Sequence, residues 1–241
     1  MTTDPLLTRA RELWLEPASV PVSFPPTGAL RVVPAPASGI CPPGWVGVVA
    51  LEGSAIATAP DPDAAAFVRA APATLPVTAL TDADAVRAVL PVDRLLGPAA
   101  PAYASPDAFR PAEPGAPTLE QLPAEHPDLR ALEKLAGEQD AGEAGLWGIS
   151  SPAFAVREGG AVVAAAGYLA RPGRTAHISV LTAPARRGRR LARVTGAATT
   201  AHALAAGLLP QWRARVPASR RVAVALGFRE LGLQLSLRLA R

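Results

Sequence analysis

The chain has 241 residues, of which 49% are apolar, and it carries a net charge of +4. This length and composition exclude a disordered chain and predict one large or two small globular domains. The single cysteine, Cys41, excludes an internal disulfide framework and fits a reducing compartment. We therefore expect a cytoplasmic protein without a secretion signal or a membrane-spanning segment.

The first 90 residues show helical and strand periodicities in alternation. Glu52, Gly53 and Ser54 divide an apolar run and indicate the turn of a β-hairpin. The predicted elements are a helix over 1–17, a strand over 29–36, the hairpin over 44–60, and helices over 61–71 and 82–90. Residues 91–128 are rich in proline and lack periodicity, which predicts a linker or an irregular layer of loops.

The second half of the chain alternates strands and helices more clearly. Gly159 and Gly160 lie between two apolar runs and indicate another hairpin. Leucines at every second position from 231 to 239 predict a half-buried final strand. The predicted order is a helix over 129–137, the hairpin over 154–170, a strand over 176–182, a helix over 189–206, a strand over 208–214, a helix over 217–226 and the final strand. This order predicts an α/β fold with a mixed sheet.

Charge is distributed unevenly along the chain. Residues 171–241 contain 14 arginines and one acid, Glu230, whereas the rest of the chain holds 19 of the 20 acids. A basic C-terminal third predicts an anionic partner for that third. We expect no nucleic-acid partner, because Trp212 and Phe228 are too few aromatic residues there for a stacking platform.

The segment VLTAPARRGRRLA (180–192) places a glycine among arginines between a predicted strand and a predicted helix. Backbone amides at a helix start, together with the helix dipole, favour an anion there. Gly188 allows the backbone to approach a ligand closely, and guanidinium groups match phosphate oxygens in geometry. The segment is therefore a candidate phosphate site, with a solvated helix start as the alternative.

The same segment resembles the acyl-CoA signature of the GNAT superfamily of N-acetyltransferases. Residues 210–232 resemble the next strand and helix of that family, and the hairpin over 154–170 fits the strands that come before. The resemblance covers about residues 129–241 and implies a GNAT-like α/β fold, a mixed central sheet flanked by helices. The remaining residues, 1–128, would form an N-terminal α+β domain that ends in the proline-rich linker. Three roles stay open for that domain: a degenerate acetyltransferase-like half, an extension that shapes the substrate site, or a surface for a homodimer.

The resemblance also implies a binding site for acetyl-CoA. Backbone groups of the strand would pair with the acetyl carbonyl and the pantetheine arm, and the arginine turn would hold the diphosphate. The implied cofactor-binding residues are Val180, Leu181, Thr182, Arg187, Gly188, Arg189, Arg190, Leu191 and Ser219. Arg190 stands where the family usually has glycine or alanine, so its side chain must point away or embrace the phosphate. We expect no metal, because three histidines and one cysteine form no ligand pattern.

Two of the family's usual proton carriers are absent, because Ala176 and Ala223 occupy their positions. His177 and Glu143 are candidate catalytic bases, although each also has a structural interpretation. Trp212 is a candidate residue of the acceptor pocket, or a core residue. Positioning and backbone donors supply much of the rate in such a reaction.

We therefore expect an acetyl-CoA-dependent N-acetyltransferase that acetylates a primary amine by direct transfer in a ternary complex. The acceptor would be a small molecule or a peptide, without a nucleic-acid or membrane partner. The alternative is a non-catalytic acyl-CoA-binding or sensor protein.

Overall fold

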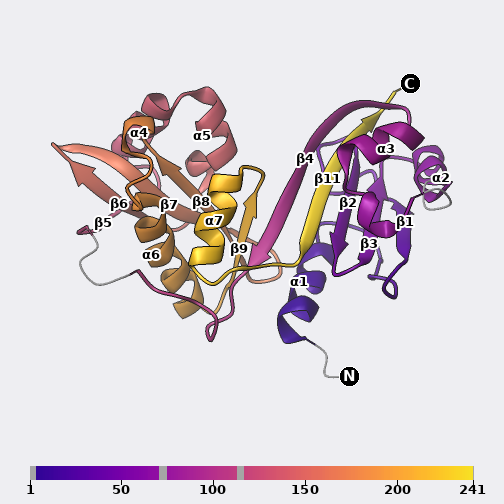
Figure 1. The fold of residues 1–241 in the computed structure, drawn as a ribbon, viewed down its shortest axis with the longest axis horizontal. Coiled ribbons are helices and arrows are strands. Elements are labelled where there is room, and N and C mark those ends of the chain that lie inside the picture. The colour runs from indigo at the N-terminus through magenta and orange to yellow at the C-terminus, as the bar shows by residue number, and fades with distance from the viewer. Residues whose placement is uncertain (1–3, 71–74, 113–116, 241) are drawn as a thin grey trace. The chain divides into compact units, whose positions relative to one another are not determined.

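The computed structural model describes residues 4–70, 75–112 and 117–240, and the chain divides into two compact units (Figure 1). The first unit combines Met1–Pro101 with Glu230–Arg241, and the second is Ala102–Arg229. These units divide the chain differently from the two domains predicted from sequence, 1–128 and 129–241, whose boundary stays a prediction.

The sheet of the first unit runs in the order β1-β3-β2-β11-β4, and β1 and β3 are parallel while the other neighbours are antiparallel. Its strands are β1 (Leu30–Pro34), β2 (Val46–Leu51), β3 (Ser54–Ala59), β4 (Val92–Tyr103) and β11 (Gly232–Leu239). Its helices are α1 (Pro5–Leu15), α2 (Pro62–Ala70) and α3 (Ala83–Val89), with a short 3-10 helix, η2 (Val77–Ala79).

Local sequence signals explain most of these elements. Glu52 and Gly53 have φ angles of 47° and 75°, the left-handed conformation that a tight hairpin turn requires. Helix starts carry aspartate caps: Asp61 accepts from the amide of Ala64 at 2.8 Å, and Asp82 accepts from the amide of Ala85 at 2.8 Å. The predicted hairpin and helices of this unit are confirmed, except that positions 1–3 and 71 of the predicted helices lie outside the described residues.

Two predictions, for residues 91–128 and for the final strand, were wrong. The proline-rich stretch 91–128 contains the 12-residue strand β4 as well as the short strand β5 (Glu120–Leu122). A shift of the β4–β11 register around Gly97 and Pro98 explains how β4 accommodates a proline, since a bulged residue donates no ladder hydrogen bond.

The final strand, β11, is buried on both faces at its centre rather than half-buried. It lies between β2 and β4 inside the sheet, with Leu235 and Leu237 in the core. On its other face the Gln234 side-chain amide donates to the Ile40 carbonyl at 2.7 Å, so the polar side chain is satisfied without water.

The sheet of the second unit runs in the order β5-β6-β7-β8-β9; β8 and β9 are parallel and the other neighbours are antiparallel. Its longer strands are β6 (Ala153–Glu158), β7 (Ala161–Arg171), β8 (Thr175–Thr182) and β9 (Leu209–Ala214). Its helices are α4 (Pro127–Ala136), α5 (Glu138–Ala144), α6 (Leu191–Ala205) and α7 (Pro217–Ala225), with the 3-10 helices η3 (Leu146–Gly148) and η4 (Pro184–Arg186). The short strand β10 (Arg229–Glu230) lies where the chain passes back to the first unit.

Helices cover both faces of this second sheet. Ala176 and Ile178 of β8 pack in a cluster with α6 and α7, whereas Leu181 packs in a cluster with Leu129 and Leu132 of α4. The predicted strand–helix alternation is confirmed here, and so is the mixed α/β fold class. Helix α5 was not predicted.

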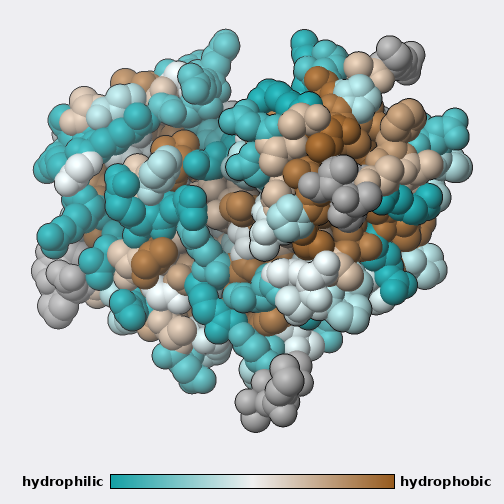
Figure 2. All heavy atoms as spheres, turned by 45° about the vertical axis from the view of Figure 1, so that its right-hand side comes forward, coloured by the Kyte–Doolittle hydropathy of each residue, from teal (hydrophilic) through white to brown (hydrophobic). Residues whose placement is uncertain are grey.

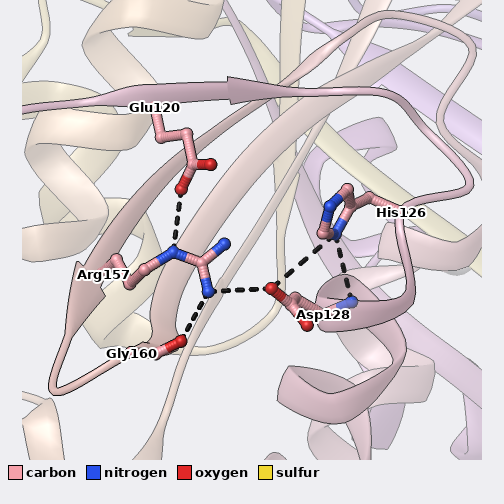
Figure 3. A network of polar contacts seen from close by, with 5 residues as sticks. All are labelled: Glu120, His126, Asp128, Arg157 and Gly160. Atoms are coloured by element: carbon pink, nitrogen blue, oxygen red, sulfur yellow. Dashed lines mark hydrogen bonds and ion pairs between the residues drawn. The ribbon is translucent and has the colours of Figure 1, made fainter.

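One arginine holds the outer edge of the second sheet together (Figure 3). Arg157 of β6 donates to Glu120 of β5 at 2.9 Å and to the Gly160 carbonyl in the hairpin turn at 2.6 Å. It also pairs with Asp128 of α4 at 2.8 Å, while His126 caps the same helix by accepting from the Asp128 amide at 3.2 Å. The edge strand, the hairpin and the helix start are thereby fixed by one guanidinium.

Some large apolar side chains are exposed on the surfaces of the two units. Figure 2 shows hydrophobic residues gathered in the right-hand part of the view and hydrophilic residues over most of the rest. Phe67 of α2 and Leu96 of β4 are exposed in the first unit, and Trp147 of η3 is exposed in the second. Among the described residues, no helix combines the length and apolar character that crossing a bilayer requires.

Candidate functional site

The two parallel strands of the second unit separate shortly after they begin to pair. Within the described residues, β8 and β9 are paired only at Thr175–Leu209, Ala176–Pro210 and His177–Gln211. Strand β8 continues to Thr182 and keeps its other edge paired with β7, and β9 continues to Ala214. The facing edges therefore present backbone groups that no strand satisfies.

A cavity of about 540 Å³ occupies the space where the strands separate. Strand β8 contributes Ile178, Val180, Leu181 and Thr182 to its lining, and β9 contributes Trp212, Arg213 and Ala214. Further lining residues come from α5, the turn between β8 and α6, and α7. An extended ligand in this cavity would meet two open strand edges, which is the geometry of strand addition.

One wall of the cavity is the start of α6. Gly188, Arg190, Leu191 and Ala192 all line it. The earliest helical amides bonded within the turn are those of Arg193 and Val194, which donate to the Arg190 carbonyl at 3.0 and 3.2 Å. The amides of Leu191 and Ala192 precede the helical hydrogen-bond ladder and are available to an anion.

Backbone conformation explains the glycine in this turn. Gly188 has a φ of 78°, and a Cβ built on it meets nothing within 4 Å, so its conformation rather than crowding calls for glycine. Arg190, the N-cap of α6, is also left-handed, with a φ of 61°, and makes no side-chain cap hydrogen bond. Arg190 therefore adopts a left-handed conformation, which glycine adopts without strain.

The arginines of the turn are engaged by acids of neighbouring elements. Arg187 pairs with Asp140 of α5 at 2.5 Å. Arg186 and Arg189 both pair with Glu158 of β6 at 2.8 Å, and Arg189, then Arg186, lower the pKa of that carboxyl. Arg189, one of the predicted cofactor-binding residues, is not among the residues that line the cavity, whereas Arg186, Arg187 and Arg190 are.

The cavity is nevertheless strongly basic. Among the described lining residues, six arginines face two carboxylates, an excess of four positive charges. The arginines are Arg186, Arg187, Arg190, Arg193, Arg213 and Arg221, and the acids are Asp140 and Glu143. Burial and then the nearby Arg171 lower the pKa of Arg213 to about 10, which leaves it protonated at neutral pH. Such a cavity suits a polyanion.

Trp212 serves both the core and the cavity wall. It is 4% exposed, meets Phe228 edge-on at 5.5 Å between ring centroids, and donates its indole N–H to the Ser219 hydroxyl at 2.9 Å. Trp212 is thus a core residue that also lines the cavity, and its role in an acceptor pocket stays a prediction. Ser219 lines the cavity as well, with its oxygen accepting from the indole.

Thr182 carries a buried hydroxyl without a partner. Its Oγ1 forms no hydrogen bond with any residue that the structure describes, and the residue lines the cavity. An unsatisfied buried hydroxyl costs about 1–3 kcal/mol. This atom is therefore suited to a polar group of a ligand, such as an amide of a pantetheine arm.

His177 lies outside the cavity lining. Its Nδ1 is 3.1 Å from the Gln211 side-chain oxygen, and Gln211 in turn donates to the Tyr103 hydroxyl at 3.2 Å. Burial, followed by the charges of Arg213 and Arg171, lowers the pKa of His177 to about 3. The ring is therefore neutral at physiological pH and a weak base.

Glu143 lies on α5 and does line the cavity. Its carboxylate is held by Arg215, which donates through Nε at 3.1 Å and through a second nitrogen.

His202 forms a hydrogen bond with the Tyr168 hydroxyl at 3.2 Å. Ala176 and Ala223, at the positions of the missing proton carriers, are buried in the core. No metal-binding group of histidine, cysteine, aspartate or glutamate is found in the described part of the chain.

The family model described as GNAT acetyltransferase matches residues 152–232. The matched span contains β8, β9 and the arginine turn, so it contains the separated strands and most of the cavity. This region is similar in sequence to the GNAT acetyltransferases. No curated protein matches the chain.

Solved GNAT structures resemble this chain. A GNAT-family protein from Novosphingobium aromaticivorans is 26% identical over 61% of this chain and 65% of its own, with a TM-score of 0.49. A GNAT acetyltransferase from Colwellia psychrerythraea is 14% identical over 62% of this chain and 58% of its own, with a TM-score of 0.46. The matches thus span less than two thirds of both proteins. A GCN5-related N-acetyltransferase from Kribbella flavida is 17% identical over 98% of this chain and 96% of its own, with a TM-score of 0.54, a likeness of fold.

Proposed function

We propose that the protein is an acetyl-CoA-dependent N-acetyltransferase that acetylates a primary amine by direct transfer in a ternary complex. The observation that carries this proposal is the cavity between β8 and β9, which joins open strand edges to a basic helix start. The match of the same region to the GNAT acetyltransferase family model supports it. The acceptor would be a small molecule or a peptide.

The residues of the cavity fit the parts of acetyl-CoA. The open edge of β8 at Val180, Leu181 and Thr182 would pair with the amides of the pantetheine arm, and the Thr182 hydroxyl would gain its missing partner. The amides of Gly188, Leu191 and Ala192 would bind the diphosphate. Cationic side chains around the cavity, Arg190, Arg193 and Arg221 among them, would neutralise the phosphate charges.

Bound acetyl-CoA supplies an activated acetyl group on a thiolate leaving group. As the amine attacks, a C–N bond forms, the C–S bond breaks, and the amine proton must reach the thiolate. Open backbone amides along β8 would stabilise the developing oxyanion. Glu143 lines the cavity and is the better placed of the two predicted bases, whereas the depressed pKa of His177 makes it a weak one. Water can relay the proton from the amine to the thiolate.

Binding is tested by thermal-shift titration and calorimetry with acetyl-CoA. Gly188→Asp places a negative charge in the turn and should abolish binding. Gly44→Asp is the matched control, because Gly44 has the same φ of 78°, equally open surroundings, and a place in the first unit. Full binding by the Gly188 variant would remove the phosphate assignment.

A second candidate function is a non-catalytic acyl-CoA-binding protein. It is favoured by the buried alanines at 176 and 223 and by the position of His177 outside the cavity. A panel of amines assayed by thiol release separates the two candidates. Release with at least one amine supports the transferase, and tight binding without release supports the binding protein.

A further inference from the structure

Helix α5 is tied across the cavity by two ion pairs. Asp140 pairs with Arg187 in the turn after β8 at 2.5 Å, and Glu143 pairs with Arg215 after β9. The two anchors thus lie on the continuations of the two separated strands. The side chains of Arg187 and Asp140 are 51% and 41% exposed, so ligands and solvent reach this pair.

The two anchors differ in their relation to the cavity. Asp140 and Arg187 both line it, whereas Arg215, the partner of Glu143, is not among the lining residues. Arg187 directly precedes Gly188, which lines the cavity together with the start of α6. An anion bound to this turn therefore meets a guanidinium that a carboxylate already holds.

A carboxylate and a diphosphate compete for one guanidinium. Both accept charge-assisted, forked hydrogen bonds. Their like charges repel each other at short range, so the two anions do not share the cation without loss. The diphosphate carries more charge and also receives the backbone amides of the helix start.

We infer that Asp140 is an internal competitor of the acyl donor: it holds Arg187 in the empty cavity and yields it to the diphosphate on binding. This inference rests on the function proposed above. The affinity for the donor is then set partly by a residue that makes no favourable contact with it. Donor binding also releases one of the two anchors of α5.

The test is calorimetric titration of CoA into the full chain and five variants. Asp140→Asn should tighten binding about twofold to fivefold, the range that an exposed ion pair is worth. Arg187→Gln should weaken binding, and adding Asp140→Asn to it should change nothing further. Glu138→Gln is the matched control, with the same loss of charge on the same helix at a residue outside the cavity lining, and it should have a smaller effect. Asp140→Ala repeats the test with a second side chain.

Ligand fragments locate the effect within the molecule. Dephospho-CoA keeps the diphosphate and should show the same gain in Asp140→Asn, whereas pantetheine lacks it and should show none. Weaker or unchanged CoA binding in the Asp140 variants, or a gain that persists without Arg187, would overturn the inference alone. Absence of CoA binding by the unmodified chain would overturn the proposed function as well.

Discussion

Replacing Arg190 with glycine should leave the second unit more stable than replacing it with alanine. Arg190 has a φ of 61°, and the left-handed conformation costs an L-residue about 1–2 kcal/mol relative to the right-handed one. Glycine avoids that strain but loses about 0.5–1 kcal/mol more conformational freedom on folding. The arginine makes no side-chain cap hydrogen bond, so no cap is lost.

The balance is a gain over the alanine variant of about 0.5–1 kcal/mol in the free energy of unfolding, or a rise in Tm of roughly 1–4 °C for a chain of this size. Urea denaturation and calorimetry measure both quantities. Arg190→Ala is the control, because it removes the same guanidinium and keeps the strained backbone. If the glycine variant is no more stable than the alanine variant, the argument from backbone strain is wrong.

Two further predictions concern Thr182 and His177. Thr182→Val should weaken pantetheine binding about fivefold, equivalent to a hydrogen bond of about 1 kcal/mol, without loss of stability; calorimetry with unchanged affinity would contradict it. Below pH 6.5 the unfolded chain protonates His177, which the folded chain resists down to about pH 3, so stability should fall as pH falls through that window. In urea titrations at pH 7 and 5, His177→Gln should lose less stability than the unmodified chain; an equal loss contradicts the prediction.

Short-range signals made much of the fold predictable. Paired left-handed residues at 52–53 and 159–160 form the predicted hairpins, and Gly207 and Gly227 follow the ends of α6 and α7. The arginine turn also lies between a strand and a helix as expected. Each of these features depends on residues within a few positions of one another.

What escaped prediction depends on partners distant in sequence. The sequence of β4 resembles a proline-rich loop, and its pairing with strands far along the chain, such as β11, makes it a strand. The same holds for the charges of the site. Asp140 and Arg187 are 47 residues apart, and Glu143 and Arg215 are 72 apart, so the sequence shows the arginines but not the acids that hold them.

The brief contact between β8 and β9 bears on how the second unit divides its interaction energy. Within the described chain three residue pairs join β8 and β9, whereas strands of eight and six residues could have formed more. The backbone hydrogen bonds that these strands do not form contribute nothing to folding and can form only with a ligand. The unit without a ligand is therefore less stable than one with fully paired strands would be. A molecule that binds between β8 and β9 would supply these hydrogen bonds and thereby extend the sheet.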